Sequence, residues 1–231
     1  MGLVETLQVI VTSADGTQTR SLPRVNILEP SWRIVRFGGY GDATIPTNLP
    51  FDGAKAQAIL KGDRVRIYAG GTLQYEGYVT GKLFSTGSPD RYSLSCYGAS
   101  LFLQGVPCNQ TFAFPYGSVD VAQAFREFAQ VYLLGATGPQ GNRLIDYIQA
   151  LPIGVDFFGD LDATDKTAKD VLDALAQQAG NLAVWGVDTD PNGWRRLYFR
   201  PFASVSGLAA LFCTLRLFES GDCCAICVAI V

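Results

Sequence analysis

A predicted β-hairpin at residues 62–79 constrains the fold of this chain more than any other stretch. Its sequence is G-D-R-V-R-I-Y-A-G-G-T-L-Q-Y-E-G-Y-V. Val65, Ile67 and Ala69 alternate with polar or amphipathic residues, which is typical of a strand with one buried face. Gly70-Gly71 supplies the positive φ angles of a two-residue turn, and the same alternation resumes after it. The stretch therefore predicts two antiparallel strands joined by a tight turn.

A third strand is predicted at Arg91–Tyr97, where residues again alternate after the turn-forming run T-G-S-P-D. Three successive strands of this kind form a β-meander. A sheet must bury one face and protect its edges, and closing the sheet does both. We therefore expect a small antiparallel β-barrel, closed or half closed.

Further segments extend this first domain toward the N-terminus. A hairpin is predicted from residues 3–13 and 17–22, around the turn Asp15-Gly16. The glycine-rich run F-G-G-Y-G-D-A-T-I-P leads into a strand at Asp42–Ile45, and a short helix is predicted over Gly53–Leu60. The barrel domain is expected to occupy residues 1–104.

The second half has the pattern of a smaller α+β domain with two helices, at residues 105–201. One helix is predicted at Val119–Leu134 with Ser118 as its N-cap. The other is predicted at Thr167–Ala179, capped by Thr164 or Asp165.

Short strands accompany these two helices. The pattern predicts a strand at residues 153–157 and a hairpin whose strands lie near residues 182–186 and at Arg195–Arg200. The fold class is therefore α+β and rich in β-structure. Residues 202–231 form an apolar, cysteine-rich C-terminal segment for which no structure is predicted.

Composition excludes several kinds of function. Hydrophobic residues make up 48% of the chain and charged residues 17%, which is typical of a globular protein. The net charge of −3 argues against a nucleic-acid-binding surface. The absence of histidine excludes Ser-His-Asp and Cys-His catalysis and histidine-ligated metals. No apolar run reaches the ~18 residues needed to span a bilayer.

Two groups of carboxylates could bind a cation. Asp188, Asp190, Asn192 and Gly193 match the first half of a calcium loop, but the position of the bidentate glutamate is occupied by Phe199. A hairpin turn is the favoured interpretation. The second group could hold a hard cation or provide an acid–base pair, although a solvated loop with one helix cap is favoured. Its members are Asp156, Asp160, Asp162 and Asp165.

Cysteines and aromatic residues supply the remaining candidates. Cys224 and Cys227 form one C-x-x-C pair, with Cys213 and Cys223 nearby, whereas a zinc ribbon normally has two such pairs. Buried or disordered cysteines are therefore favoured over a metal site. Four aromatic residues could form a sugar-binding platform, but packing in the core of the small sheet is the favoured interpretation. They are Trp185, Trp194, Tyr198 and Phe199.

Taken together, the ordered segments resemble the tail hub and baseplate hub proteins of tailed bacteriophages and related contractile injection systems. The resemblance lies in the glycine-rich run F-G-G-Y-G-D-A-T-I, the hairpin at 62–79, the strand R-Y-S-L-S-C-Y-G-A, the helix D-K-T-A-K-D-V-L-D-A-L-A-Q-Q-A-G-N and the strand ending L-Y-F-R-P. It covers roughly Val25–Pro201. Hub proteins are usually longer than this chain.

The resemblance implies a structural, non-enzymatic virion protein with no cofactor, metal or catalytic residue. The implied role is a ring, usually a homotrimer, at the tail tip or baseplate, which joins the tail tube to a central spike or fibre and lines part of the DNA-ejection channel. Distal-tail or baseplate proteins are further implied partners, and assembly is implied in the host bacterial cytoplasm. The alternatives are a hexameric distal-tail or adaptor ring, a carbohydrate- or receptor-binding β-module, and a cell-wall hydrolase.

Overall fold

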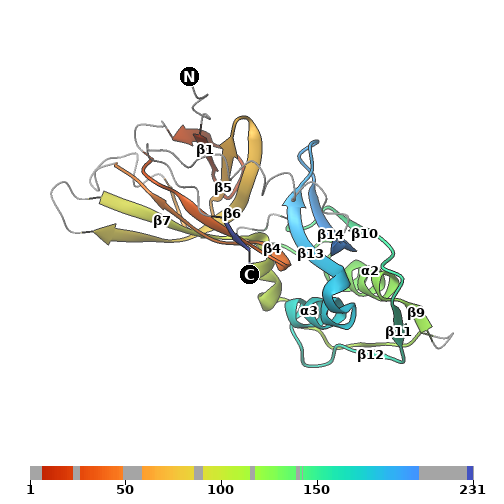
Figure 1. The fold of residues 1–231 in the computed structure, drawn as a ribbon. Coiled ribbons are helices and arrows are strands. Elements are labelled where there is room, and N and C mark those ends of the chain that lie inside the picture. Colours follow the sequence, from red (N-terminus) through yellow and green to blue (C-terminus); the bar gives the residue numbers. More distant parts are fainter. Residues whose placement is uncertain are drawn as a thin grey trace, which may run out of the picture. The chain divides into compact units, whose positions relative to one another are not determined.

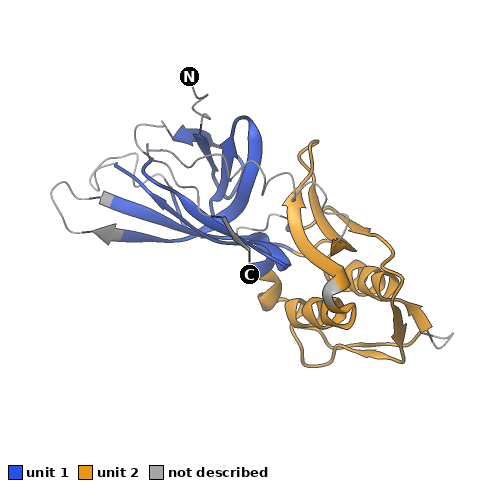
Figure 2. Cartoon of the chain, viewed as in Figure 1, with its two compact units in different colours: residues 1–101, 137–144, 226–231 blue, residues 102–136, 145–225 orange. Residues whose placement is uncertain are grey.

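The structure is a computed structural model, and it describes residues 7–22, 27–48, 59–85, 91–114, 118–138, 141, 143–202 and 228–230. It divides into two compact units, coloured separately in Figure 2. Unit 1 comprises residues 1–101, 137–144 and 226–231, and unit 2 comprises residues 102–136 and 145–225. No helix in the described ranges is long and apolar enough to cross a membrane.

Unit 1 is built on a twisted sheet whose strands follow the order β15-β3-β4-β7-β6-β5-β1-β2 (Figure 1). All neighbouring pairs are antiparallel except β15 and β3, which are parallel. The strands are β1 (Leu7–Thr12), β2 (Thr19–Leu22), β3 (Ser31–Val35), β4 (Phe37–Pro46), β5 (Arg64–Ala69), β6 (Thr72–Ser85), β7 (Arg91–Tyr97) and β15 (Val228–Ile230).

The predicted meander is confirmed. Strands β5 and β6 pair with Ala69 opposite Thr72, so the loop between them is Gly70-Gly71, and both glycines have positive φ. Strand β7 spans the predicted residues Arg91–Tyr97 and pairs with the second half of β6. The first predicted hairpin is also present as the β1–β2 pair.

The barrel itself is not confirmed, because the described strand path is open. Its ends are β2 and β15, and the described residues contain no pairing that joins them. The apolar residues of the alternating strands nevertheless share one face and form a single core. That core includes Val9, Val11, Trp32, Ile45, Val65, Ile67, Tyr75, Leu94 and Cys96.

Unit 2 places two helices against a small sheet. Strands β13 (Ala183–Thr189) and β14 (Arg195–Pro201) form an antiparallel hairpin, and β10 (Tyr147–Ala150) pairs in parallel with β14. Helices α2 (Val121–Tyr132) and α3 (Ala168–Gln178) contact this sheet (Figure 1). The predicted α+β, β-rich fold class with two α-helices is therefore confirmed for the residues that the structure describes.

Short elements complete unit 2. Strand β9 pairs with β11 and β8 with β12, in two ribbons of two strands each. Their bounds are β8 (Thr111–Phe112), β9 (Ser118–Asp120), β11 (Asp156–Phe158) and β12 (Leu161–Asp162). The 3₁₀ helices are η2 (Ala99–Gly105), which runs across the division between the units, and η4 (Gly180–Leu182).

Both predicted helix caps are wrong by a few residues. Ser118 lies in β9, and Asp120 caps α2 by accepting a hydrogen bond from the Ala122 amide at 2.8 Å. Thr167 caps α3 in a reciprocal capping box with Asp170. Several residue types can cap a helix, so tertiary pairing of the preceding residues decided which one did.

Two sequence predictions lie largely outside the described residues. The predicted helix over Gly53–Leu60 has only Ile59 and Leu60 within the described ranges, and neither is helical. Residues 203–227 of the C-terminal segment are also outside them, as are its four cysteines.

Candidate assembly surfaces

The tyrosine–glycine motif of the central hairpin is explained by close packing. The Tyr75 ring is fully buried, its hydroxyl donates to the Gly41 carbonyl at 3.0 Å, and it meets the Tyr40 ring edge-on at 5.5 Å. It also covers Gly77, where a Cβ would lie 2.3 Å from the tyrosine oxygen. The aromatic-x-Gly pattern is therefore a packing device, because the aromatic ring fills the space that the glycine leaves.

A buried carboxylate ties three segments of unit 1 together. Asp63 is almost fully buried, and its two carboxylate oxygens accept hydrogen bonds from the Ala14 amide at 3.0 Å and the Leu60 amide at 2.8 Å. Its main chain pairs with Val79 of β6. The Gly-Asp dipeptide at the start of the hairpin thus anchors the β1–β2 turn to β5 and β6, a role that sequence reasoning missed.

Asp120 has a corresponding role in unit 2. Besides capping α2, its carboxylate accepts hydrogen bonds from the Ile153 amide and, at 2.8 Å, from the Gly154 amide. The Val121 amide donates to the Val155 carbonyl at 2.9 Å. One side chain therefore fixes both the start of α2 and the path of the chain into β11.

We expect Asp120→Ala to destabilise unit 2 by about 2 kcal/mol, because the cap is lost and two further amides lose their acceptor. Chemical denaturation followed by far-UV circular dichroism measures the loss. Asp120→Asn keeps one acceptor oxygen and should cost less. The matched control is Asp160→Ala, an exposed aspartate in the neighbouring turn. A loss no larger than that of the control would contradict this role.

Residues 188–193, which match the first half of a calcium loop, form a hairpin turn. This was the favoured interpretation of the sequence. Asp188 forms a bidentate ion pair with Arg196, whose Nε and Nη2 donate to the two carboxylate oxygens at 2.9 and 2.7 Å. Asp190 accepts from the Asn192 and Trp194 amides at 2.9 Å and from the Tyr147 hydroxyl at 3.1 Å. Both carboxylates are thus used by internal partners.

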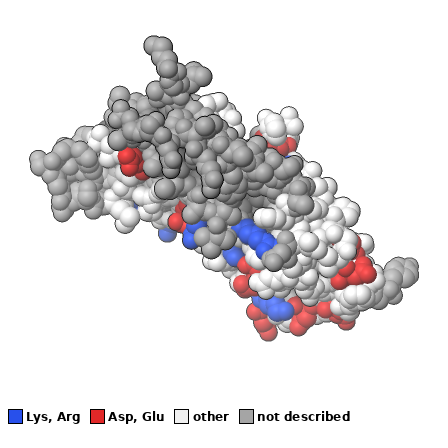
Figure 3. Space-filling view, in the orientation of Figure 1, with Lys and Arg blue, Asp and Glu red and all other residues white. Residues whose placement is uncertain are grey.

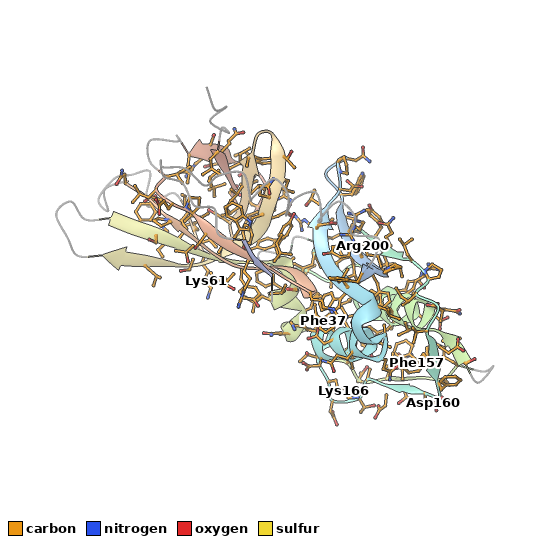
Figure 4. All side chains as sticks on the ribbon, viewed as in Figure 1. Phe37, Lys61, Phe157, Asp160, Lys166 and Arg200 are labelled. Atoms are coloured by element: carbon orange, nitrogen blue, oxygen red, sulfur yellow. The ribbon has the colours of Figure 1, made fainter. Side chains whose placement is uncertain are left out.

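The second group of aspartates is spread along the segment from β11 to α3. Asp162 accepts a 3.0 Å hydrogen bond from the Thr164 amide, and this bond and further ones lower the pKa of Asp162 below its ordinary value. Asp156, Asp160 and Asp165 are exposed (Figure 4 labels Asp160). Within the described ranges, no three acidic or cysteine side chains are grouped so as to hold a metal ion.

The four candidate aromatic residues do not form one platform. Trp185 and Phe199 are fully buried on the helix-facing side of the sheet, where Phe199 stacks on Phe125 at 4.5 Å. The Trp185 indole donates to Asp173 of α3 at 3.0 Å. Tyr198 lies on the opposite face beneath Arg200, and Trp194 is 59% exposed at the turn. Core packing therefore accounts for two of the four.

The described cysteines, Cys96 and Cys108, are free and buried. Burial raises the pKa of the Cys96 thiol from 9.0 to about 12. The neutral thiol is the form that packs in the unit 1 core, whereas reactivity requires the thiolate. Cys96 is therefore a structural core residue.

Cys96 also makes stability depend on pH. Its folded pKa lies above its unfolded value, so its contribution is complete below pH 9 and is lost as the pH rises toward about 12. Tyr198, whose pKa burial raises from 10.0 to about 12, acts in the same direction above pH 10. We expect the urea midpoint to fall between pH 9 and pH 12, and to fall less in Cys96→Ala. Equal pH dependence in both proteins would contradict this assignment.

Large apolar side chains remain exposed in both units. In unit 1 these are Leu60 and Leu83, which are 56% and 61% exposed. In unit 2 the most exposed is Phe158, at 73%. Exposed groups of this size are common at protein–protein contacts, and the sequence pattern alone did not distinguish them from core residues.

Neither a protein-family model nor a curated protein matches this chain. Solved structures do match. The 43 kDa tail protein of prophage MuSo2 from Shewanella oneidensis is 16% identical with a TM-score of 0.51, covering 84% of this chain and 53% of that one. Prophage tail protein gp18 from Listeria monocytogenes EGD-e is 12% identical with a TM-score of 0.53, covering 84% and 50%.

These likenesses establish a shared fold. The chain has the fold of one part of these prophage tail proteins, and it spans about half the length of the solved structures that it matches. A type VI secretion system component from E. coli, described as similar to T4 bacteriophage tail proteins gp27 and gp5, is 12% identical with a TM-score of 0.39, which is too low to establish a shared fold.

Proposed function

We propose that this chain is a structural component of a phage tail, a hub protein that forms a ring at the tail tip or baseplate. The observation that carries the proposal is the fold, which matches two prophage tail proteins over 84% of this chain. Independently of that match, the hairpin, the meander and the capped helix follow one another along the chain in an order that resembles the order found in hub proteins.

The described side chains support a structural role. The carboxylates that the sequence singled out in the hairpin turn are held by Arg196, by backbone amides and by Tyr147. Buried Asp63 and Asp120 each tie main-chain segments together. Such groups maintain the shape of a docking scaffold, and we propose no catalytic role for them.

In this proposal, unit 1 contributes to a ring that continues the tail tube, and the ring carries a central spike or fibre. The ring encloses part of the path that DNA follows during ejection. A trimer is the expected stoichiometry for a hub.

Quantitative mass spectrometry of purified phage particles tests the proposal. We expect about three copies per tail for a hub, whereas about six copies would identify the alternative, a distal-tail or adaptor ring. Absence of the chain from purified tails would contradict the proposed function. An antibody to the chain should label the tail tip in electron micrographs.

A carbohydrate-binding module is the second candidate, because Trp194 is exposed beside polar groups at the hairpin turn. It predicts a monomer whose binding to cell-wall glycans is abolished by Trp194→Ala. The hub proposal predicts that this substitution leaves the tail copy number unchanged.

A further inference from the structure

The charges of this chain are divided unequally between its two units. Unit 1 holds eleven Lys and Arg residues against eight Asp and Glu, and unit 2 holds seven against thirteen. The net charges are therefore +3 and −6, which together give the −3 of the whole chain. Figure 3 shows several acidic side chains, with basic ones among them, over the part of unit 2 that holds β11 and β12.

The β9–β11 ribbon of unit 2 presents an exposed phenylalanine within this acidic region. Phe157, labelled in Figure 4, is buried and packs edge-on against Phe114 with 5.5 Å between the ring centroids. The next residue of the strand, Phe158, therefore points away from the core. Phe158 is 73% exposed, and it lies in the sequence between Asp156 and Asp160, which are also exposed.

The ribbon is held in place, so Phe158 is preorganised. Phe158 lies opposite Ser118 in the antiparallel pair, and the Asp120 carboxylate fixes the residues that lead into β11. A large aromatic side chain on a fixed support loses little conformational entropy on binding and makes an effective anchor.

Unit 1 carries three exposed residues of complementary character, which are Leu60 and Lys61 in the turn before β5 and Leu83 on β6. Leu60 and Leu83 are both more than half exposed, and Lys61 is exposed beside Leu60. The Gly62 amide donates to the Val79 carbonyl at 2.8 Å, so this turn runs alongside the part of β6 that leads to Leu83. Buried Asp63 fixes the Leu60 amide.

We propose that copies of this chain associate head to tail, with the Phe158 ribbon of one copy docking on Leu60, Lys61 and Leu83 of the next. The apolar side chains form the centre of the contact, and Asp156 and Asp160 face Lys61 at its rim. A contact between two different surfaces generates a ring when the rotation closes. The inference rests on the proposed function, because it specifies how the ring forms.

Charge complementarity selects a second copy as the occupant. An acidic ribbon is repelled by the same ribbon on another copy but attracted by the more basic unit, so a head-to-tail contact is favoured over a symmetric one. Attraction at the rim also implies that association weakens as salt increases.

Analytical ultracentrifugation of the full chain tests this proposal. Phe158→Ser should weaken self-association about 10-fold or more, whereas Val131→Ser, at an exposed position on α2, should not. Lys61→Glu and Asp160→Lys should each weaken it, and Glu29→Lys, which changes the net charge by the same amount as Asp160→Lys, should not. Raising the salt from 50 mM to 500 mM should weaken association of the unaltered chain.

Exchange of the two charges distinguishes this contact from any other. Lys61→Glu and Asp160→Lys combined in one chain should restore association. A strictly monomeric chain, or association unaffected by Phe158→Ser and by both charge variants, would overturn the proposal. A ring insensitive to these variants would leave the proposed tail function intact, because the copy number per tail tests that function separately.

Discussion

Gly98→Ala should destabilise unit 1 by at least about 3 kcal/mol, a large part of the stability of a typical domain. A Cβ at this position would lie 1.8 Å from the Tyr40 carbonyl oxygen and 2.7 Å from its carbon. The Gly98 amide also donates to the Gly41 carbonyl at 2.9 Å. Relief of the clash requires the backbone of β4 to move, because the obstructing atoms belong to the main chain.

Urea denaturation measures this effect, and Gly81→Ala is its matched control. Gly81 also lies in the unit 1 sheet, on β6, but a Cβ there has no atom within 4 Å. Because alanine loses less backbone entropy than glycine on folding, the control should be unchanged or more stable by about 0.5 kcal/mol. Equal urea midpoints for the two variants would show that the close approach at Gly98 is unimportant.

Phe199→Ala should destabilise unit 2 by about 3–5 kcal/mol. Phe199 is fully buried, lies opposite Trp185 in the β13–β14 pair and stacks on Phe125 of α2. The substitution removes the stacked ring and leaves a cavity between the sheet and the helix. Urea unfolding followed by far-UV circular dichroism and by tryptophan fluorescence reports the loss.

Phe158→Ala is the control for that substitution. Phe158 is exposed, so its removal should change the free energy of unfolding by less than about 0.5 kcal/mol. If Phe158→Ala were as damaging as Phe199→Ala, then Phe158 would be part of the folded core, and the head-to-tail contact proposed for it would lose its anchor.

Strand prediction succeeded where alternation coincided with turn chemistry. Arg91–Tyr97 and the Gly70-Gly71 turn were predicted to the residue, since a period of two and two positive-φ glycines are both local properties. The β13–β14 turn was predicted for the same reason. Helix starts were less accurate, because Ser118 and Asp120 are both acceptable caps, and pairing of β9 with β11 decided between them.

The residues that hold the segments together could not be identified from the sequence. Nothing local distinguishes Asp63 and Asp120 from exposed aspartates, because their partners, Ala14 and Gly154, are distant along the chain. The same is true of Phe157 and Phe158, adjacent residues with opposite surroundings.

The sequence by itself determined the meander, the β1–β2 and β13–β14 hairpins and the two helices of unit 2, because periodicity and turn chemistry depend on neighbouring residues. It did not predict the short strands β8, β9, β10 and β12. Only the tertiary structure decided the strand order, the open path of the sheet, the buried carboxylates and the side chains that remain exposed. These features depend on contacts between residues far apart in the chain, whose free energy is set by burial and close packing after the segments meet.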